Sequence, residues 1–257
     1  MILGSFEQPV RAFIQGGSGG IGLGFVHCLL GDPHVAKVFA SSRHPSESTA
    51  LKRLKDREGT RLQLLSMDVT AEASIADAAA AVSSTTAGID LLIYCAGILH
   101  DERGMRPERR LTDVEAEAVL RSFQVNALGA LLVAKHFQRL FDRSARCVLA
   151  NLSARVGSVG DNRLGGWYGY RASKAAQNMI TRNLSIELRR RCRGIICVAL
   201  HPGTVDTGLS KPFQGNVGEG KLFSTGQATR QLLQVIDSLS PESNGRFYAW
   251  DGKEIVW

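Results

Sequence analysis

Tyr170 and Lys174 lie within residues 168–174, where a long stretch with apolar residues at helical spacing begins. On a helix, positions i and i+4 project from the same face, with Cβ atoms about 6 Å apart. An ammonium group beside a phenol favours the phenolate and lowers the pKa of the tyrosine. Such a tyrosine can transfer a proton in step with another bond change. Tyr168 has Ala172 at its i+4 position and lacks this cation. The spacing therefore favours Tyr170 as a proton donor.

The amino-terminal part of the chain predicts a nucleotide site. An apolar strand pattern over residues 10–15 is followed by Gly16, Gly20 and Gly22 in a Gly-x-x-x-Gly-x-Gly turn, and then by apolar residues at helical spacing. Glycines permit a tight turn and close backbone approach, while the helix amino terminus presents unpaired N–H groups to phosphates. This order favours dinucleotide binding over a merely flexible glycine loop.

Further motifs follow in a recognisable order. They are Asp68-Val69 after a predicted strand, Tyr94-Cys95-Ala96-Gly97, Asn126 in Val-Asn-Ala, Ser153 at a strand end, and the turn Pro202-Gly203-Thr204-Val205-Asp206-Thr207. Together with the glycine turn and the tyrosine–lysine pair, they make the whole chain resemble the short-chain dehydrogenase/reductase superfamily of the classical type. Residues 161–168 and 209–213 look like the subgroup around C-factor and sniffer-like carbonyl reductases.

The resemblance implies a role for each of four residues. Tyr170 would donate the proton to a nascent alkoxide, and Ser153 would hydrogen-bond the same oxygen. Lys174 would bind the nicotinamide ribose and lower the Tyr170 pKa, while Asn126 would hold a water that links Lys174 to solvent. Three of these residues also have a purely structural interpretation. Asn126 could cap backbone groups in a helix interruption, Ser153 could merely end a strand, and Lys174 could be a solvated helix lysine.

The resemblance also implies the cofactor contacts, which are distributed along the chain. They are Gly16, Ser18, Gly20, Ile21, Gly22, Arg43, Asp68, Val69, Ala96, Gly97, Tyr170, Lys174, Pro202, Gly203, Val205 and Thr207. Among them, the family's aspartate at the Asp68 position binds the adenine ring. The family usually has two asparagines where this chain has Tyr94 and Cys95, so the hydrogen bonds of that turn differ.

The end of the second predicted strand indicates which dinucleotide is bound. An acidic residue there would hold the ribose 2′-hydroxyl of NAD, whereas an arginine suits the 2′-phosphate of NADP. Residues 40–44 contain no Asp or Glu, and Arg43 with Ser41 and Ser42 could form a phosphate cradle. An arginine stacked on the adenine would tolerate either cofactor, and the glycine turn lacks the basic residue of many NADP enzymes. The sequence favours NADP and leaves NAD open.

Alternating strand and helix patterns predict the fold. Strands are expected near 10–15, 35–41, 61–67, 89–95, 146–152, 194–200 and 246–250. Helices are expected near 20–30, 46–58, 72–86, 111–122, 124–142, 168–191 and 221–239. This α/β alternation predicts one domain over residues 1–257, with a doubly wound Rossmann-type parallel sheet of about seven strands and helices on both faces. Ligands bind beyond the carboxyl ends of such strands, so loops 155–166 and 207–220 should border the substrate.

Two helical regions predict local and quaternary contacts. Thr112 and Glu115 are spaced as a capping box for the helix expected at 111–122. The helices at 168–191 and 124–142 carry a wider apolar arc than a helix needs to cover a sheet. Family members often pair these two helices with their two-fold copies, so we expect a homodimer or homotetramer. The alternative is that the extra apolar residues cover one another.

Composition narrows the possible locations and partners. The five cysteines are odd in number, without Cys-x-x-Cys spacing, which favours reduced thiols in a cytoplasmic protein, and the histidines form no metal pattern. The net charge of +7 comes without a nucleic-acid-binding motif. The chain shows no signal peptide and no uninterrupted apolar run of membrane-spanning length. We therefore expect no metal, no nucleic-acid partner and no membrane insertion.

These observations favour an NADP-dependent oxidoreductase that reduces a small or moderately apolar carbonyl to an alcohol. Two alternatives remain open. One is an NAD-linked alcohol dehydrogenase that works in the opposite direction. The other is a dinucleotide-binding signalling protein of the C-factor kind, in which catalysis is incidental.

Overall fold

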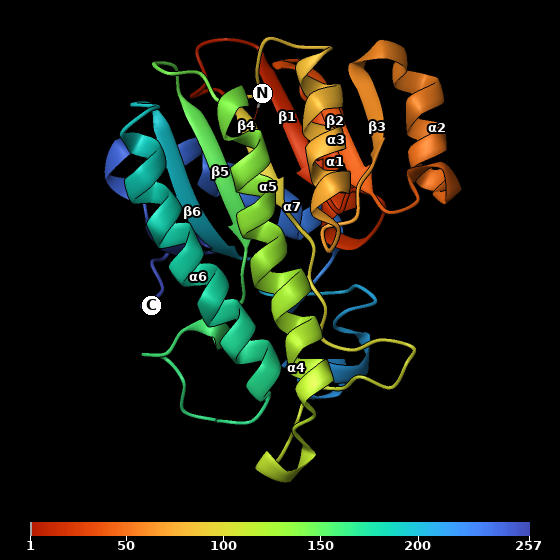
Figure 1. Cartoon of the computed structure of the whole chain (residues 1–257), viewed down its shortest axis with the longest axis vertical. Coiled ribbons are helices and arrows are strands. Elements are labelled where there is room, and N and C mark those ends of the chain that lie inside the picture. Colours follow the sequence, from red (N-terminus) through yellow and green to blue (C-terminus); the bar gives the residue numbers. More distant parts are fainter. Residues whose placement is uncertain (1) are drawn as a thin grey trace.

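Seven parallel strands form the central sheet of the computed structural model, which describes residues 2–257 (Figure 1). The strands lie in the order β3-β2-β1-β4-β5-β6-β9. They are β1 (Val10–Gln15), β2 (Val35–Ser42), β3 (Leu62–Ser66), β4 (Leu91–Tyr94), β5 (Cys147–Leu152), β6 (Ile195–His201) and β9 (Phe247–Ala249). The central strands are buried along almost their whole length, as expected for a parallel sheet covered on both faces.

Helices cover both faces of the sheet. On one face, α1 (Gly20–Leu30), α2 (Thr49–Glu58) and α7 (Thr225–Ser238) bury apolar residues against the strands. On the other face lie α3 (Glu72–Ser83), α5 (Gly129–Phe137) and α6 (Tyr168–Arg189). Figure 1 shows α5 and α6 side by side across the sheet, with α4 (Ala116–Phe123) leading into α5. The predicted doubly wound α/β fold is confirmed.

The carboxyl ends of the central strands lie at one edge of the sheet. In the strand register, Gln15 pairs with Ser41 on one side and Tyr94 on the other, Tyr94 pairs with Asn151, and Asn151 pairs with Ala199. The strand order reverses between β1 and β4, and a crevice at such a reversal is where doubly wound folds bind ligands. The motifs of the sequence therefore meet at this edge.

The helix predicted at 111–122 begins later than expected, and its predicted capping box is wrong. Residues Leu111–Asp113 form a separate 3₁₀ turn, and α4 begins at Ala116. The carboxylate of Asp113 accepts hydrogen bonds from the backbone N–H groups of Arg109 and Arg110, which closes this turn ahead of the helix. Thr112 therefore lies inside the turn and does not cap α4.

The carboxyl-terminal elements also differ from the prediction. The helix expected at 221–239 begins at Thr225, because the Ser224 hydroxyl accepts the Gln227 N–H as an N-cap. The residues before it pair instead as a small two-stranded sheet, β7 (Thr204–Val205) with β8 (Leu222–Phe223). This pairing anchors both ends of the 207–220 loop.

One continuous helical run, Ala116–Leu140, is long and apolar enough to cross a bilayer by length and composition alone. No membrane insertion was expected, because the sequence has no uninterrupted apolar run of this length. Within this run, residues Gln124–Leu128 form a π-helix between α4 and α5. The run packs against α3 and α6 in the fold, and a core helix passes the same test as a membrane span.

Candidate active site

The glycine turn connects β1 to α1 and shows why glycine is required there. Gly16 and Gly20 have positive φ angles of 82° and 50°, a region that favours glycine. A Cβ on Gly22 would lie 2.1 Å from the Gly16 carbonyl oxygen, so the turn passes too close for any side chain. The first turn of α1 has no side-chain cap. Its N–H groups and the helix dipole are therefore available to an anion.

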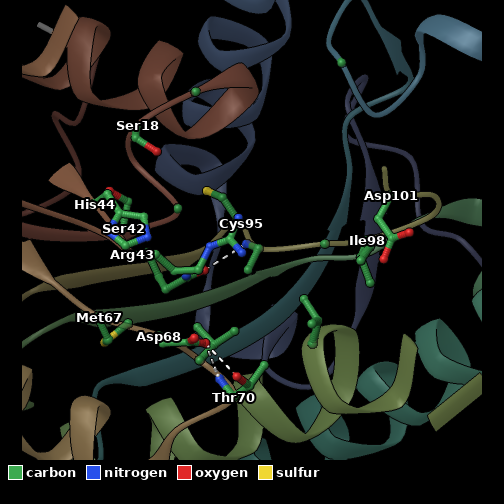
Figure 2. Close-up of a pocket in the computed structure, with 18 of the residues that line it drawn as sticks. Ser18, Ser42, Arg43, His44, Met67, Asp68, Thr70, Cys95, Ile98 and Asp101 are labelled. Atoms are coloured by element: carbon green, nitrogen blue, oxygen red, sulfur yellow. Dashed lines mark hydrogen bonds between the residues drawn. The ribbon is translucent and has the colours of Figure 1, made fainter. Parts of the chain in front are cut away.

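A cavity of about 900 Å³ opens beside this turn (Figure 2). Its lining includes seven of the predicted cofactor contacts, namely Gly16, Ser18, Arg43, Asp68, Val69, Ala96 and Gly97. The other predicted contacts lie outside this lining. Of these, Thr207 lies against the turn, since a Cβ on Gly20 would be 3.4 Å from its methyl carbon. Ile21 and Val205 pack into a common small cluster with Phe223.

The end of β2 forms a polar corner of the cavity. Arg43 is exposed there beside Ser42 and His44, as Figure 2 shows. The hydroxyl oxygens of Ser41 and Ser42 are buried and have no hydrogen-bond partner among the described residues. A buried hydroxyl without a partner is costly, and Ser42 lines the cavity. This corner therefore fits a ligand that carries a phosphate group.

Asp68 follows β3 on the adjacent wall. Its carboxylate accepts hydrogen bonds from the backbone N–H and the hydroxyl of Thr70, both at 2.8 Å (Figure 2). Burial acts to raise the pKa of Asp68, but the Thr70 hydrogen bonds and the nearby Arg43 and Arg121 guanidinium groups lower it overall. The carboxyl group therefore stays ionised beside the cavity.

The turn after β4 replaces the family's asparagines with different contacts. The Ala96 N–H donates to the side-chain oxygen of Gln15 at 2.8 Å, and Gln15 is buried at the end of β1. The Tyr94 hydroxyl donates to the Val125 carbonyl within the π-helix. Cys95 lines the cavity, and burial raises the pKa of its thiol. The turn is held without asparagine side chains.

Asn126 is buried in the π-helix and joins three segments. Its side-chain oxygen accepts the Ile98 N–H at 2.8 Å, while its NH₂ group donates to the Ile98 carbonyl and to the Ser173 hydroxyl. A Cβ on Gly97 would lie 3.6 Å from the Asn126 side-chain oxygen and 3.8 Å from the Lys174 Nζ. The structural interpretation of Asn126 therefore holds, and its predicted water-holding role stays a prediction.

Lys174 and Ser153 lie close together in a buried polar network. The Lys174 Nζ donates to the carbonyl oxygen of Leu152, the residue before Ser153, at 2.8 Å. The Ser153 hydroxyl donates to the Asn178 side-chain oxygen at 2.6 Å. Lys174 and Ser153 are 3% and 4% exposed. Lys174 is thus not a solvated helix lysine.

The electrostatics of Tyr170 differ from the sequence prediction. Burial raises the pKa of Tyr170 to about 12, although a lowered pKa was expected. Burial also lowers the pKa of Lys174 to about 7. The ammonium lies 5.9 Å from the centre of the Tyr170 ring and bonds to other groups. Desolvation is the cause of the Tyr170 shift, and the predicted direction is wrong.

Glu108, in the loop between β4 and α4, forms hydrogen bonds with the start of α6. Its buried carboxylate accepts the Gly169 N–H, with both oxygens at 3.2 Å, and its carbonyl oxygen accepts the Trp167 N–H. Among residues 2–257, Trp167 alone of the non-glycine residues has a positive φ, 51°, directly after Gly165 and Gly166. Glu108 therefore stabilises an unfavourable backbone conformation three residues before Tyr170.

Several residues of this edge were not predicted from the sequence, although three of them lie close to predicted site residues along the chain. Gln15 immediately precedes the glycine turn, and Gln177 and Asn178 follow Lys174 by three and four positions on the same helix. Glu108 carried no local signal, because its partner Gly169 is 61 residues away.

The fold and this edge define a dinucleotide-binding α/β enzyme with a buried tyrosine–lysine pair. The chain matches the short chain dehydrogenase family over residues 11–217 and belongs to that family. It is 36% identical over 177 residues to C-signal of Myxococcus xanthus, covering 69% of this chain and 98% of that protein.

Two solved structures are similar to this chain over nearly its whole length. NADPH-bound carbonyl reductase from chicken fatty liver has a TM-score of 0.84 and 29% identity, covering 99% of this chain and 97% of that one. Carbonyl reductase Sniffer of D. melanogaster has a TM-score of 0.85 and 27% identity, covering 98% and 100%. The predicted family and subgroup are confirmed.

Proposed function

We propose that this enzyme is an NADPH-dependent carbonyl reductase with Tyr170 as its proton donor. The observation that carries the proposal is the polar network at the carboxyl edge of the sheet. It places Lys174 5.9 Å from the centre of the Tyr170 ring and bonds it to the residue before Ser153. The NADPH-bound carbonyl reductase of chicken fatty liver, 29% identical, supports the same reaction class.

The preference for NADPH rests on the corner formed by Ser42 and Arg43. A 2′-phosphate would meet the exposed guanidinium of Arg43 and the buried, unpartnered Ser42 hydroxyl. The cofactor would supply hydride at its nicotinamide ring. Gly16, Ser18 and the start of α1 would hold the pyrophosphate, and Asp68 with Val69 would face the adenine.

Within the reaction, each residue has a separate task. Tyr170 would give its phenolic proton to the alkoxide oxygen, and Lys174 would hold the ribose. Ser153 would release its hydrogen bond to Asn178 and donate to the substrate oxygen. Asn126 would fix the turn at Gly97 next to Lys174.

Aromatic side chains support an apolar substrate. The Trp167 ring lies 6.1 Å from the Tyr170 ring and 5.1 Å from the Phe213 ring. His100 packs against Phe213 and hydrogen-bonds to the Gly208 carbonyl. These contacts join the loop at 207–220 to Trp167, which directly follows the 155–166 loop, and to the segment after β4. We propose that the chain acts as one unit and that both loops enclose a moderately apolar carbonyl.

Exposed apolar residues on α5, α6 and the π-helix support a homodimer or homotetramer. Leu128, Met179 and Ile186 are 45%, 62% and 49% exposed. Ala127 and Ala134, on the same helical run as Leu128, are buried and add nothing to this exposed surface. A second copy packed on this surface would remove the exposed side chains from water. The cytoplasmic location also stays a prediction; all five cysteines are unpaired among the described residues.

A carbonyl panel tests the proposed function. Purified protein is mixed with NADPH or NADH and with aldehydes and ketones of increasing apolar size, and the loss of absorbance at the nicotinamide band is followed. We expect turnover with NADPH that requires a carbonyl substrate. Oxidation of alcohols with NAD in place of this activity would favour the alcohol dehydrogenase alternative.

The relationship to C-signal favours one further candidate, a signalling protein that binds a dinucleotide. Titration of the protein with NADPH, combined with the carbonyl panel, distinguishes it from the enzyme. Tight NADPH binding with no turnover on any member of the panel would contradict the carbonyl reductase and support this candidate.

A further inference from the structure

Gln177 is a buried polar residue for which the mechanism above has no use. It lies on α6 one turn beyond Lys174, and its side chain is fully shielded from solvent. Its side-chain oxygen accepts a hydrogen bond from the Lys174 Nζ at 2.9 Å. Its NH₂ group has no hydrogen-bond partner among the described residues. Burying an amide with one end unpaired costs stability, so packing alone does not account for a glutamine here.

The surroundings of Lys174 show what the glutamine oxygen does. The ammonium has two acceptors, the Leu152 carbonyl of β5 and Gln177, and both are neutral. Among residues 2–257, no carboxylate forms an ion pair with it. The titratable groups that face it are the Cys95 thiol after β4 and the Tyr170 phenol on α6. A thiol and a phenol whose ionisation is opposed by burial contribute no negative charge at neutral pH.

The charge on Lys174 is therefore held by neutral dipoles against a large desolvation penalty. Burial lowers the pKa of Lys174 to about 7, so the lysine is close to losing its charge at neutral pH. A hydrogen bond to the charged form favours that form. The Leu152 carbonyl belongs to the backbone and is fixed by the sheet. Of the two acceptors, Gln177 is the one that belongs to a side chain, and a substitution can therefore remove or replace it.

We propose that Gln177 is a positioning residue that keeps the Lys174 ammonium charged and fixed beside Tyr170. This inference rests on the proposed function only where it concerns catalysis. Its electrostatic part concerns the protein alone. If Lys174 is charged through Gln177, removing the side-chain oxygen must shift the lysine towards its neutral form. Replacing the neutral oxygen by a carboxylate must shift it the other way.

The direct test is an NMR titration of the protein labelled with ¹³C at lysine Cε. The Lys174 signal is assigned as the one missing from the spectrum of Lys174→Met. We expect Gln177→Leu to lower the pKa of Lys174, because one acceptor is lost. We expect Gln177→Glu to raise it by about 1 to 3, the range for an opposite charge at close distance. Gln177→Met keeps the length of the side chain and should behave as Gln177→Leu.

Gln227→Glu is the matched control, since it adds the same charge at an exposed position on α7. It should leave the Lys174 signal unchanged. The inference is overturned if Gln177→Leu or Gln177→Met leaves the Lys174 pKa unaltered, or if Gln177→Glu fails to raise it. Two substitutions of opposite predicted sign keep the test decisive even if one of the variants fails to fold.

Activity measurements then connect the charge to catalysis. The alkaline limit of carbonyl reduction should move to lower pH in Gln177→Leu and to higher pH in Gln177→Glu, with little change in KM for the carbonyl. A merely structural glutamine would lower activity equally at every pH, and that result would overturn the catalytic part. If the NMR shifts occur but the wild-type protein reduces no carbonyl, the proposed function fails and the electrostatic inference stands.

Discussion

The two halves of the carboxyl edge are built in different ways. Around β1, β2 and β3, backbone and exposed side chains surround an open cavity, and glycines with positive φ shape the turn. Around β5, β6 and α6, the polar groups are buried and bonded to one another, as Lys174 with Gln177 and Ser153 with Asn178 show. The first half leaves its polar groups open to a large anionic ligand, whereas the second fixes a few side chains in place and desolvates them.

This difference separates binding from chemistry within one fold. An open, glycine-lined half can accept a ligand with little rearrangement, because its N–H groups already point outward. A desolvated half strengthens each electrostatic interaction and shifts pKa values, as the opposite shifts of Tyr170 and Lys174 illustrate. Substitutions in the catalytic half should therefore leave cofactor binding largely unchanged, and substitutions in the cofactor half should leave the buried catalytic network in place.

Tyr170→Phe should give the largest effect and should act on the catalytic half alone. The substitution removes only the phenolic proton, so we expect carbonyl reduction to fall by about 10²- to 10⁴-fold. NADPH affinity, measured by fluorescence titration, should stay nearly unchanged. Tyr168→Phe is the control, because Tyr168 is 42% exposed and should keep its activity. Loss of activity in Tyr168→Phe but not in Tyr170→Phe would show that the assignment is wrong.

Gly22→Ala should have the converse effect and damage the cofactor half. The added Cβ would lie 2.1 Å from the Gly16 carbonyl oxygen, so the turn must move. We expect weaker NADPH binding and a loss of about 1–3 kcal/mol in the free energy of unfolding, typical of overpacking. Gly31→Ala, at the other end of α1 and outside the cavity lining, is the control, since a Cβ there meets only ordinary contacts at 3.5 Å and Gly31 has a φ of −79°. Equal NADPH affinity in both variants would contradict a turn set by close approach.

Arg43→Asp should change which dinucleotide the cavity around β1, β2 and β3 prefers. A carboxylate would repel the 2′-phosphate that the guanidinium attracts. A hydrogen bond to a charged group contributes about 1.5–3 kcal/mol, so NADPH affinity should fall by roughly 10- to 100-fold. NADH affinity should change much less. Arg53→Asp, at an exposed position on α2 outside the cavity lining, should alter neither titration. Equal affinity of the wild-type protein for NADH and NADPH would refute the preference.

The two halves also differ in how far the sequence predicts them. Gly16, Arg43 and Asp68 were predicted as cofactor contacts because a strand, a turn and a helix carry their own local signal, and all three line one cavity. Their contact with a cofactor stays a prediction. The direction of the Tyr170 pKa shift was predicted wrongly, since i+4 spacing fixes proximity but not burial. Glu108 was missed, because its partner Gly169 lies in a distant part of the chain. Local sequence patterns therefore predict those parts of a site whose functional residues lie close together in the sequence.

Met179→Asp should give the smallest effect on the site, because Met179 lies on the outer face of α6. Its side chain is 62% exposed in the single chain, so a carboxylate there costs the monomer little. In a homodimer packed on α5 and α6, the same carboxylate would be desolvated without a partner and would oppose association. Sedimentation equilibrium should then show the wild type as a multiple of 27.8 kDa and Met179→Asp shifted towards 27.8 kDa. Val159→Asp is the control, since Val159 is 74% exposed outside these helices and should not change the mass. A wild-type protein that sediments as a monomer would contradict the interface. A change in NADPH affinity on dissociation would show that the open half depends on the neighbouring subunit.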